Sequence, residues 1–178
     1  MKLNDLNNKK IIHIDTSCKL YERKTTGIAY KIINSNLHKG LALSLRSKKE
    51  LERDLKVNKD YARFYAICIY YLIKDKFDIF DILVICGDEK FSSVKKYLKL
   101  LFKDKKEYSK KEVISIGKLR KITGNEKLKS YADKVANSYR KRGLKSKIRQ
   151  QKGTPLNIIK VNYKMVKEKW LEINDKNM

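Results

Sequence analysis

Cysteine is scarce in this sequence, which has only three cysteines among its 178 residues. Cys18, Cys68 and Cys86 are odd in number and widely separated, and the last two lie inside apolar runs. This pattern is typical of reduced, buried thiols in a cytosolic protein, and the spacing matches no zinc site.

Long apolar runs are absent as well. No stretch approaches the ~20 apolar residues of a membrane-spanning helix, and the N-terminal MKLNDLNNKK has no signal-peptide core. We therefore expect a soluble, cytoplasmic protein without a membrane partner.

Acidic residues are few relative to basic ones. The sequence has 20 Asp and Glu and 44 Lys and Arg, which gives a formal net charge of +24. Such an excess favours a polyanionic partner, most simply nucleic acid, because neutralised phosphates release their counterions. The alternative is a solvated, lysine-rich surface without a specific partner.

Two segments concentrate the positive charge. Residues 90–111 contain nine lysines, and YRKRGLKSKIRQQK, residues 139–152, contains seven Lys or Arg and no acid. Either could be a solvated face or a flexible tail, but the second is dense enough to favour phosphate contacts. The candidate nucleic-acid-binding residues are Lys95, Lys99, Arg140, Lys141, Arg142, Lys145, Lys147 and Arg149.

The hydropathy pattern predicts a mixed α/β fold. Strands are expected at residues 11–15, 25–33, 40–46, 80–86 and 112–117. Helices are expected at residues 60–77, capped by Asn58, at about 91–102 and at about 126–142. The first three strands form an antiparallel meander, and the apolar FDILVIC is typical of a buried parallel strand. The order β-β-β-α-β-α-β-α predicts a five-stranded mixed sheet flanked by helices.

A basic extension, residues 143–178, follows the domain formed by residues 1–142. Thr154-Pro155 is typical of a helix start, and later apolar residues keep helical spacing. We expect a C-terminal helix that docks on the domain, although NIIKVNY, residues 157–163, could form a short strand. The residues with helical spacing are Tyr163, Val166, Trp170 and Ile173.

Four aspartates lie at the ends of predicted elements. Asp15 ends the first strand, and a carboxylate there is costly to bury unless a positive group meets it. Asp60 opens a helix, Asp88 follows the fourth strand and Asp133 lies in the last long helix. These ends can converge on one side of a mixed sheet.

Simpler roles exist for three of the aspartates. Asp60 could favour a helix N-terminus through its charge, and Asp88 could shape a Gly-Asp turn. Asp133 could pair with a lysine one turn away along its helix.

Three motifs follow the predicted strand order: IDTSC at residues 14–18, VICGDEKFSSVKKYL at residues 84–98 and ADKVAN at residues 132–137. Together they resemble the type 1 ribonuclease H family. That family begins with Asp-Gly-Ser, often followed by Cys, and IDTSC at residues 14–18 is similar. It places Thr-Asp-Ser after its fourth strand, where this chain has VICGDEKFSSVKKYL, residues 84–98. It ends with an Asp-x-Leu-Ala helix, which ADKVAN matches through Asp133, Val135 and Ala136. The resemblance covers roughly residues 9–142.

The resemblance implies a ribonuclease H fold and a hydrolase: a metal-dependent endonuclease that cuts the RNA strand of RNA–DNA hybrids. Asp15 would bridge two Mg²⁺ or Mn²⁺ ions, and Asp60, Asp88 and Asp133 would hold them from either side. Two such ions about 4 Å apart activate a water and stabilise the leaving oxygen. Oxygen ligands suit both metals. We expect a monomer.

The sequence departs from the family at three places. Thr16 replaces the family's Gly, and Asp60 stands where the family usually has Glu. If Asp60 is too short to reach the metal, the ligand would be a nearby acid, Glu50, Glu52 or Asp54.

The third departure is the loop before the last helix, GKLRKITGNEK, which lacks the family's histidine. His13, in the first strand, and His38, in a turn, cannot replace it. The candidate electrostatic substitutes are Lys118, Arg120 and Lys121.

Two other functions remain open from the sequence. One is another nuclease of the same fold, such as a junction resolvase or an exonuclease. The other is a non-catalytic module that keeps the fold and the basic surface to bind nucleic acid.

Overall fold

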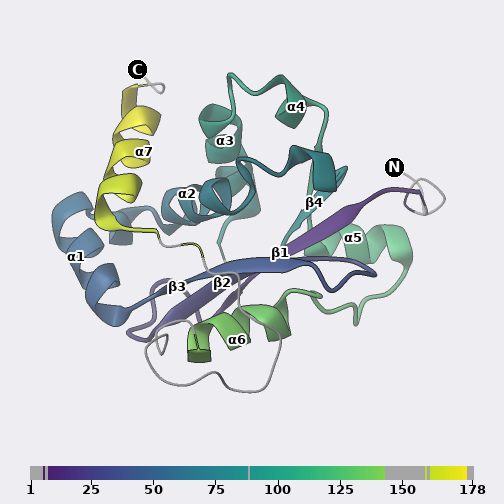
Figure 1. The fold of residues 1–178 in the computed structure, drawn as a ribbon, viewed down its shortest axis with the longest axis horizontal. Helices are drawn as coiled ribbons and strands as arrows, with labels where there is room; N and C mark the ends of the chain where they lie inside the picture. The colour runs from purple at the N-terminus through teal and green to yellow at the C-terminus, as the bar shows by residue number, and fades with distance from the viewer. Residues whose placement is uncertain (1–5, 7, 88, 143–158, 160, 176–178) are drawn as a thin grey trace.

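The computed structural model describes residues 6, 8–87, 89–142, 159 and 161–175, and its centre is a five-stranded sheet (Figure 1). The strands are β1 (Ile11–Ser17), β2 (Thr26–Ile32), β3 (His38–Leu43), β4 (Ile82–Ile85) and β5 (Glu112–Ser115). They lie in the order β3-β2-β1-β4-β5. The first three strands are antiparallel, while β4 and β5 run parallel to β1. The expected mixed α/β fold is confirmed.

Helices cover both faces of this sheet (Figure 1). They are α1 (Leu45–Leu55), α2 (Tyr61–Ile73), α3 (Phe91–Leu101), α4 (Lys106–Ser109), α5 (Ile116–Thr123), α6 (Asp133–Arg142) and α7 (Tyr163–Asp175), with 3₁₀ turns at Val57–Lys59 and Phe77–Ile79. Helices α2, α3 and α7 share one core with the sheet, and α5 and α6 pack on the opposite face. No helix in the described ranges is both long and apolar enough to cross a membrane.

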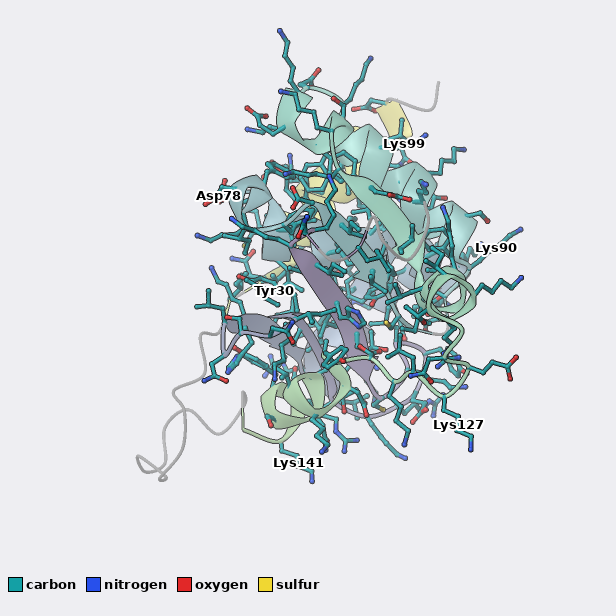
Figure 2. The ribbon with its side chains drawn as sticks, turned by 90° about the vertical axis from the view of Figure 1, so that its right-hand side faces the viewer. Tyr30, Asp78, Lys90, Lys99, Lys127 and Lys141 are labelled. Atoms are coloured by element: carbon teal, nitrogen blue, oxygen red, sulfur yellow. The ribbon has the colours of Figure 1, made fainter. Side chains whose placement is uncertain are left out.

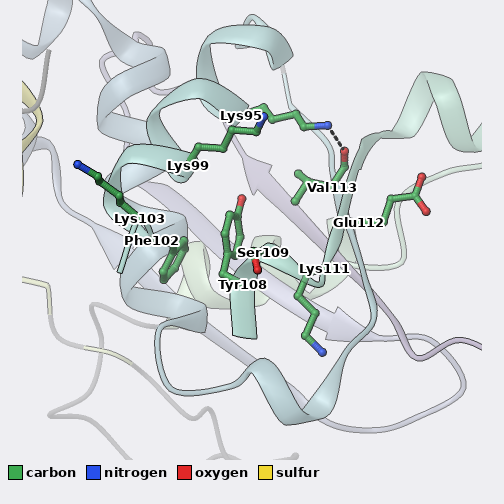
Figure 3. A pocket seen from close by; sticks show the side chains of 9 residues that line it. All are labelled: Lys95, Lys99, Phe102, Lys103, Tyr108, Ser109, Lys111, Glu112 and Val113. Atoms are coloured by element: carbon green, nitrogen blue, oxygen red, sulfur yellow. Dashed lines mark hydrogen bonds between the residues drawn. The ribbon is translucent and has the colours of Figure 1, made fainter. Parts of the chain in front are cut away.

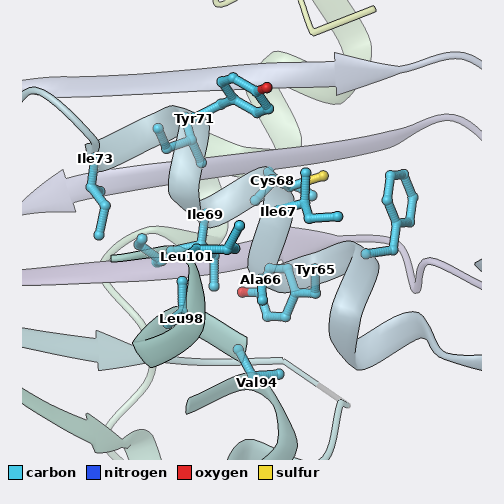
Figure 4. Close-up of a cluster of buried hydrophobic side chains, with 14 of the residues drawn as sticks. Tyr65, Ala66, Ile67, Cys68, Ile69, Tyr71, Ile73, Val94, Leu98 and Leu101 are labelled. Atoms are coloured by element: carbon cyan, nitrogen blue, oxygen red, sulfur yellow. The ribbon is translucent and has the colours of Figure 1, made fainter. Parts of the chain in front are cut away.

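Helix α2 is the centre of the larger core. Eleven of its 13 residues are buried, because it lies between the sheet and helix α3. Figure 4 shows Ile69 of α2 beside Leu98 and Leu101 of α3. The predicted central position of this apolar helix is confirmed, although it ends at Ile73 rather than at residue 77.

Strand β1 presents different chemistry to its two faces. Ile12 and Ile14 belong to the α2 core, so the alternating residues between them point to the other side. There, His13 Nδ1 accepts a hydrogen bond from the Tyr131 N–H at 3.3 Å, just before α6. Ser17 Oγ donates to Asn137 Oδ1 of α6 at 3.4 Å. Because Asp15 lies between His13 and Ser17 in the strand, it faces α6 as well.

Two glycines let α6 approach the sheet closely. A Cβ atom on Gly27 would lie 2.1 Å from the carbonyl oxygen of Ala136 in α6. A Cβ atom on Gly40 would lie 2.6 Å from the ring of Tyr139, which is fully buried. The position of α6 over β2 and β3 therefore depends on the absence of both side chains.

The C-terminal helix α7 docks on the domain, as its spacing predicted. Its apolar side is buried, and Tyr71 of α2 donates its hydroxyl to the Met165 carbonyl at 2.9 Å. The Arg63 guanidinium lies 4.0 Å from the centre of the Trp170 ring. The Ile159 N–H donates to the Gly40 carbonyl at 2.8 Å, at the outer edge of β3. The predicted start at residues 154–155 lies outside the described residues.

Some predicted boundaries and placements were wrong. Helices α1, α4 and α5 were not expected, and the helix expected from residue 126 begins at Asp133. Asp15 lies within β1, which continues to Ser17, so it does not end the strand. His38 is the first residue of β3 and is not in a turn.

We predict that Gly27→Ala lowers the free energy of unfolding by about 2 kcal/mol, because its methyl group must push the α6 backbone away. Urea unfolding followed by circular dichroism measures this. Gly117→Ala is the matched control: a Cβ there meets nothing closer than Ser115 Oγ at 3.8 Å. An alanine in α5 should be neutral or stabilise by up to about 1 kcal/mol. Equal stability of the two variants would contradict the close approach.

Candidate carboxylate site

Parallel pairing of β1 with β4 builds one end of the site. Ile14 pairs with Ile85, and the Cys86 N–H donates to the Ile14 carbonyl at 2.9 Å. Asp15 and Cys86, the residues that come after this pair, therefore lie side by side at the carboxyl end of β4. Gly87 then turns the chain at φ +139°, a conformation that favours glycine. The next residue, Asp88, lies outside the described residues.

Asp133, the first residue of α6, lies at the same end of the sheet. Burial raises the pKa of the Cys86 thiol to about 12, and the charges of both Asp15 and Asp133 act in this direction. A single buried sulfur atom thus feels both carboxylates. Asp15 from β1 and Asp133 from α6 therefore both act on Cys86, at the end of β4.

Asp15 is held in a partly buried position. Its Oδ1 atom accepts the Thr16 N–H at 2.8 Å. Burial raises the pKa of Tyr65 on α2 well above its usual value, and the charge of Asp15 adds to this effect. The Tyr65 hydroxyl donates to the Cys86 carbonyl at 2.6 Å, which ties α2 to the end of β4.

Asp60 is placed differently from Asp15 and Asp133. It caps helix α2, with Oδ1 accepting the Arg63 N–H at 3.0 Å, and Oδ2 accepts the Tyr97 hydroxyl of α3. Its carboxylate is therefore directed at α3, and the structure does not bring it to β1.

The acids considered as alternatives to Asp60 lie on α1. Glu50 pairs with Arg46 at 3.0 Å, and Asp54 pairs with Arg53. Glu52 accepts the Tyr61 hydroxyl at 2.9 Å. Each of these carboxylates thus has a partner of its own.

The three candidates for the missing histidine lie on helix α5 and not in a loop. The Arg120 Nε atom donates to the Leu128 carbonyl at 2.9 Å, and its charge lowers the pKa of Cys86 against the larger effect of burial. Lys118 pairs with Glu112 at 3.4 Å, and Lys121 is exposed. Of the three, Arg120 is the one that the structure places near the carboxylates.

The predicted nucleic-acid-binding residues are spread over two helices. On α3, Lys95 is half-buried and donates to the Val113 carbonyl at 3.0 Å, whereas Lys99 extends outward (Figure 2). On α6, Arg140 donates to Asn137 Oδ1 at 3.0 Å, and Lys141 extends outward. The side chain of Arg142, at the end of α6, and the residues Lys145, Lys147 and Arg149 lie outside the described part of the chain.

Lys48 is a buried residue that the sequence did not reveal. Its ammonium group, on α1, donates to the carbonyls of Glu22 at 2.6 Å and Lys24 at 3.0 Å, and to Thr26 Oγ1 at 3.1 Å. It thereby holds the loop between β1 and β2. A lysine in a charged segment carries no signal that would distinguish it from its solvated neighbours.

The described residues fit part of a metal site. No three of their His, Cys, Asp or Glu side chains converge closely enough to hold an ion. Asp15 and Asp133 supply two carboxylates at this end of the sheet, which suits a hard divalent cation with further oxygen ligands. No family model matches the sequence, and no curated protein or solved structure matches it either.

We predict that His13 makes stability depend on pH. Burial lowers its pKa from 6.5 to about 4. The unfolded chain therefore binds a proton between these values that the folded chain does not, so stability present above pH 6.5 is lost as the pH falls toward 4. The loss is on the order of 3 kcal/mol.

Urea unfolding between pH 7 and pH 4 measures this loss. His13→Gln should flatten the pH dependence, whereas His38→Gln, at the second of the two histidines, should keep it. An unchanged slope in His13→Gln would assign the pH dependence to other groups.

Proposed function

We propose that the protein is a metal-dependent endonuclease similar to type 1 ribonucleases H, which cuts the RNA strand of RNA–DNA hybrids. The observation that carries this proposal is the joint position of Asp15 on β1 and Asp133 on α6, beside the end of β4. The parallel pairing of β1 with β4 supports it, because this pairing sets Asp15 level with Cys86 at the end of β4.

In this proposal, Asp15 and Asp133 hold a divalent ion. Bound Mg²⁺ or Mn²⁺ would supply an activated water and stabilise the leaving oxygen, and Asp88 is the candidate third ligand. The chain orients Asp15 through the Thr16 N–H and the strand around it. Arg120 supplies a fixed positive charge near the carboxylates, where the resemblance would place a histidine. Asp60 has no part in the proposed site, because both its oxygens serve α2 and α3.

Helix α6 also suits a nucleic-acid strand. Asp133 opens the helix, and Arg140 and Lys141 follow near its end. At 1.5 Å per residue, Arg140 lies about 10 Å farther along the axis than Asp133. A nucleic-acid strand that lies along α6 would contact the carboxylates at the start of the helix and the cations near its end. Phosphate contacts at the cations would position the strand over the carboxylates.

The two carboxylates that act on Cys86 favour an enzyme over a binding module. A module that only binds phosphate gains affinity from Lys and Arg and loses it where acids face the nucleic acid. Two acids at one end of the sheet, on a chain of net charge +24, are therefore unexpected in a pure binding surface. A metal-dependent reaction explains them.

We predict that Asp15→Asn and Asp133→Asn each abolish cleavage and reduce the rise in melting temperature caused by Mg²⁺. A divalent ion that binds only the folded state stabilises it, and each variant loses one charged ligand. Both should melt close to the wild-type temperature in EDTA, because Asn keeps the shape of Asp and an oxygen that accepts hydrogen bonds.

Asp60→Asn is the matched control for the same measurements. It should keep cleavage and the full response to Mg²⁺ while unfolding at a lower temperature, since it weakens the bond to Tyr97. An equal Mg²⁺ response in wild type, Asp15→Asn and Asp133→Asn would contradict the metal site.

The substrate is tested with labelled RNA–DNA hybrid, double-stranded RNA and branched DNA, each with Mg²⁺ and with Mn²⁺. Cutting of the RNA strand in the hybrid is the expected result. Cutting of branched DNA alone would identify a junction resolvase. Tight, salt-sensitive binding without cleavage of any substrate would identify a binding module.

A further inference from the structure

A pocket separate from the carboxylate site lies between α3, α4 and the edge strand β5 (Figure 3). Its volume is about 450 Å³, within the range of about 300–1,000 Å³ that is typical of small-molecule sites. None of the residues that line it belongs to the proposed metal site. Lysines and apolar side chains share its wall, which makes it half cationic and half apolar.

The cationic part of the wall consists of Lys95, Lys99, Lys103 and Lys111. Lys99 and Lys103 are exposed at its rim. The one acid in the lining, Glu112, already pairs with Lys118 at 3.4 Å. The pocket therefore presents an excess of positive charge, which a bound anion would offset.

The Tyr108 hydroxyl is the second observation that points to a ligand. Tyr108 is 94% buried, being only 6% exposed, and its ring stacks on Phe102 with the ring centres 4.5 Å apart. Among the described residues, nothing accepts or donates a hydrogen bond at this hydroxyl. Figure 3 shows it pointing from α4 toward Lys99 and Val113. A buried hydroxyl without a partner destabilises the protein, and a ligand oxygen would remove that cost.

The apolar part of the pocket wall favours a ligand that has an apolar body as well as a phosphate. Phe102, Tyr108 and Val113 are all buried and form the inner surface of the pocket. Exposed lysines are sufficient to hold a backbone phosphate of a duplex, which needs no apolar recess. A recess with apolar and cationic walls suits a compact ligand that carries both an apolar body and a phosphate.

We propose that this pocket binds a small phosphorylated ligand of mononucleotide size. Its phosphate oxygens accept hydrogen bonds from Lys99, Lys103 and the Tyr108 hydroxyl, and its apolar body lies against Phe102 and Val113.

Calorimetric titration of the full chain with ADP tests this proposal. Tyr108→Phe keeps the ring stacked on Phe102 and removes only the hydroxyl, so it should weaken ADP binding about tenfold. Without ADP it should melt at the same or a higher temperature than wild type, because an unpaired buried polar group is gone. A hydroxyl with a purely structural role would show the opposite pattern.

Lys99→Gln and Lys96→Gln form a matched pair on α3. Both lysines are exposed, but only Lys99 lines the pocket. Lys99→Gln should weaken ADP binding several-fold, and Lys96→Gln should leave it unchanged. Asp15→Asn should also leave it unchanged, so that the pocket can be judged independently of the nuclease proposal.

Several results would overturn the proposal. Absence of ADP binding to the wild type would do so, as would equal losses in Lys99→Gln and Lys96→Gln, which indicate diffuse charge attraction. Adenosine should bind far more weakly than ADP, and pyrophosphate should also bind more weakly. Pyrophosphate binding as tight as that of ADP would contradict the role of the apolar wall. If Tyr108→Phe weakened binding of an RNA–DNA duplex but not of ADP, the pocket would belong to a nucleic-acid surface instead.

Discussion

The parallel hydrogen bonding between β1 and β4 is the constraint on which the other features of the molecule depend. Strands that run parallel need a crossover between them, and here the chain returns through α1 and the apolar α2. The bond from Cys86 to Ile14 then sets Asp15 level with the end of β4. Because α2 fills one face of the sheet, the polar side chains of β1 have only the opposite face available.

Helix α6 covers that opposite face, and its close packing restricts which residues the sheet can carry beneath it. Its backbone lies so close to β2 that position 27 must be glycine, and Tyr139 occupies the space over Gly40. His13 and Ser17 are thereby buried beneath the helix, and Asp15 is partly buried. A half-buried carboxylate and a buried histidine lower the stability of a core, and such costs commonly accompany functional sites.

The fold could be predicted from the sequence because its inner elements carry strong patterns. The apolar runs of β1 and β4 and the apolar α2 were all recognised. Helix α1 was missed because only Lys48 and Leu51 are buried in it. Helix α5 was also missed, although it is bounded by a Ser115 cap and a left-handed Gly124, which are typical start and stop signals of a helix.

The candidate site was harder to predict than the fold. The resemblance predicted Asp15, Asp60, Asp88 and Asp133 together as metal ligands, whereas the structure places Asp60 at the cap of α2. Only the positions of Arg63 and Tyr97 distinguish a cap from a ligand, and Tyr97 is distant from Asp60 in the chain. The pocket beside Tyr108 has no sequence signature at all, because its lysines come from a segment with nine lysines between residues 90 and 111.

The contact of Ile159 with Gly40 has a consequence for how copies of this chain behave together. Strand β3 is an outer strand of the sheet, and the Gly40 carbonyl points away from β2 at a position where a strand from another molecule could pair. The C-terminal segment occupies this position, and α7 covers the flank of α2. A chain shortened before Ile159 would expose a free strand edge next to an apolar surface. Such a truncation would remove basic residues and promote self-association at the same time. The nucleic-acid affinity measured for a truncated protein would therefore reflect both changes.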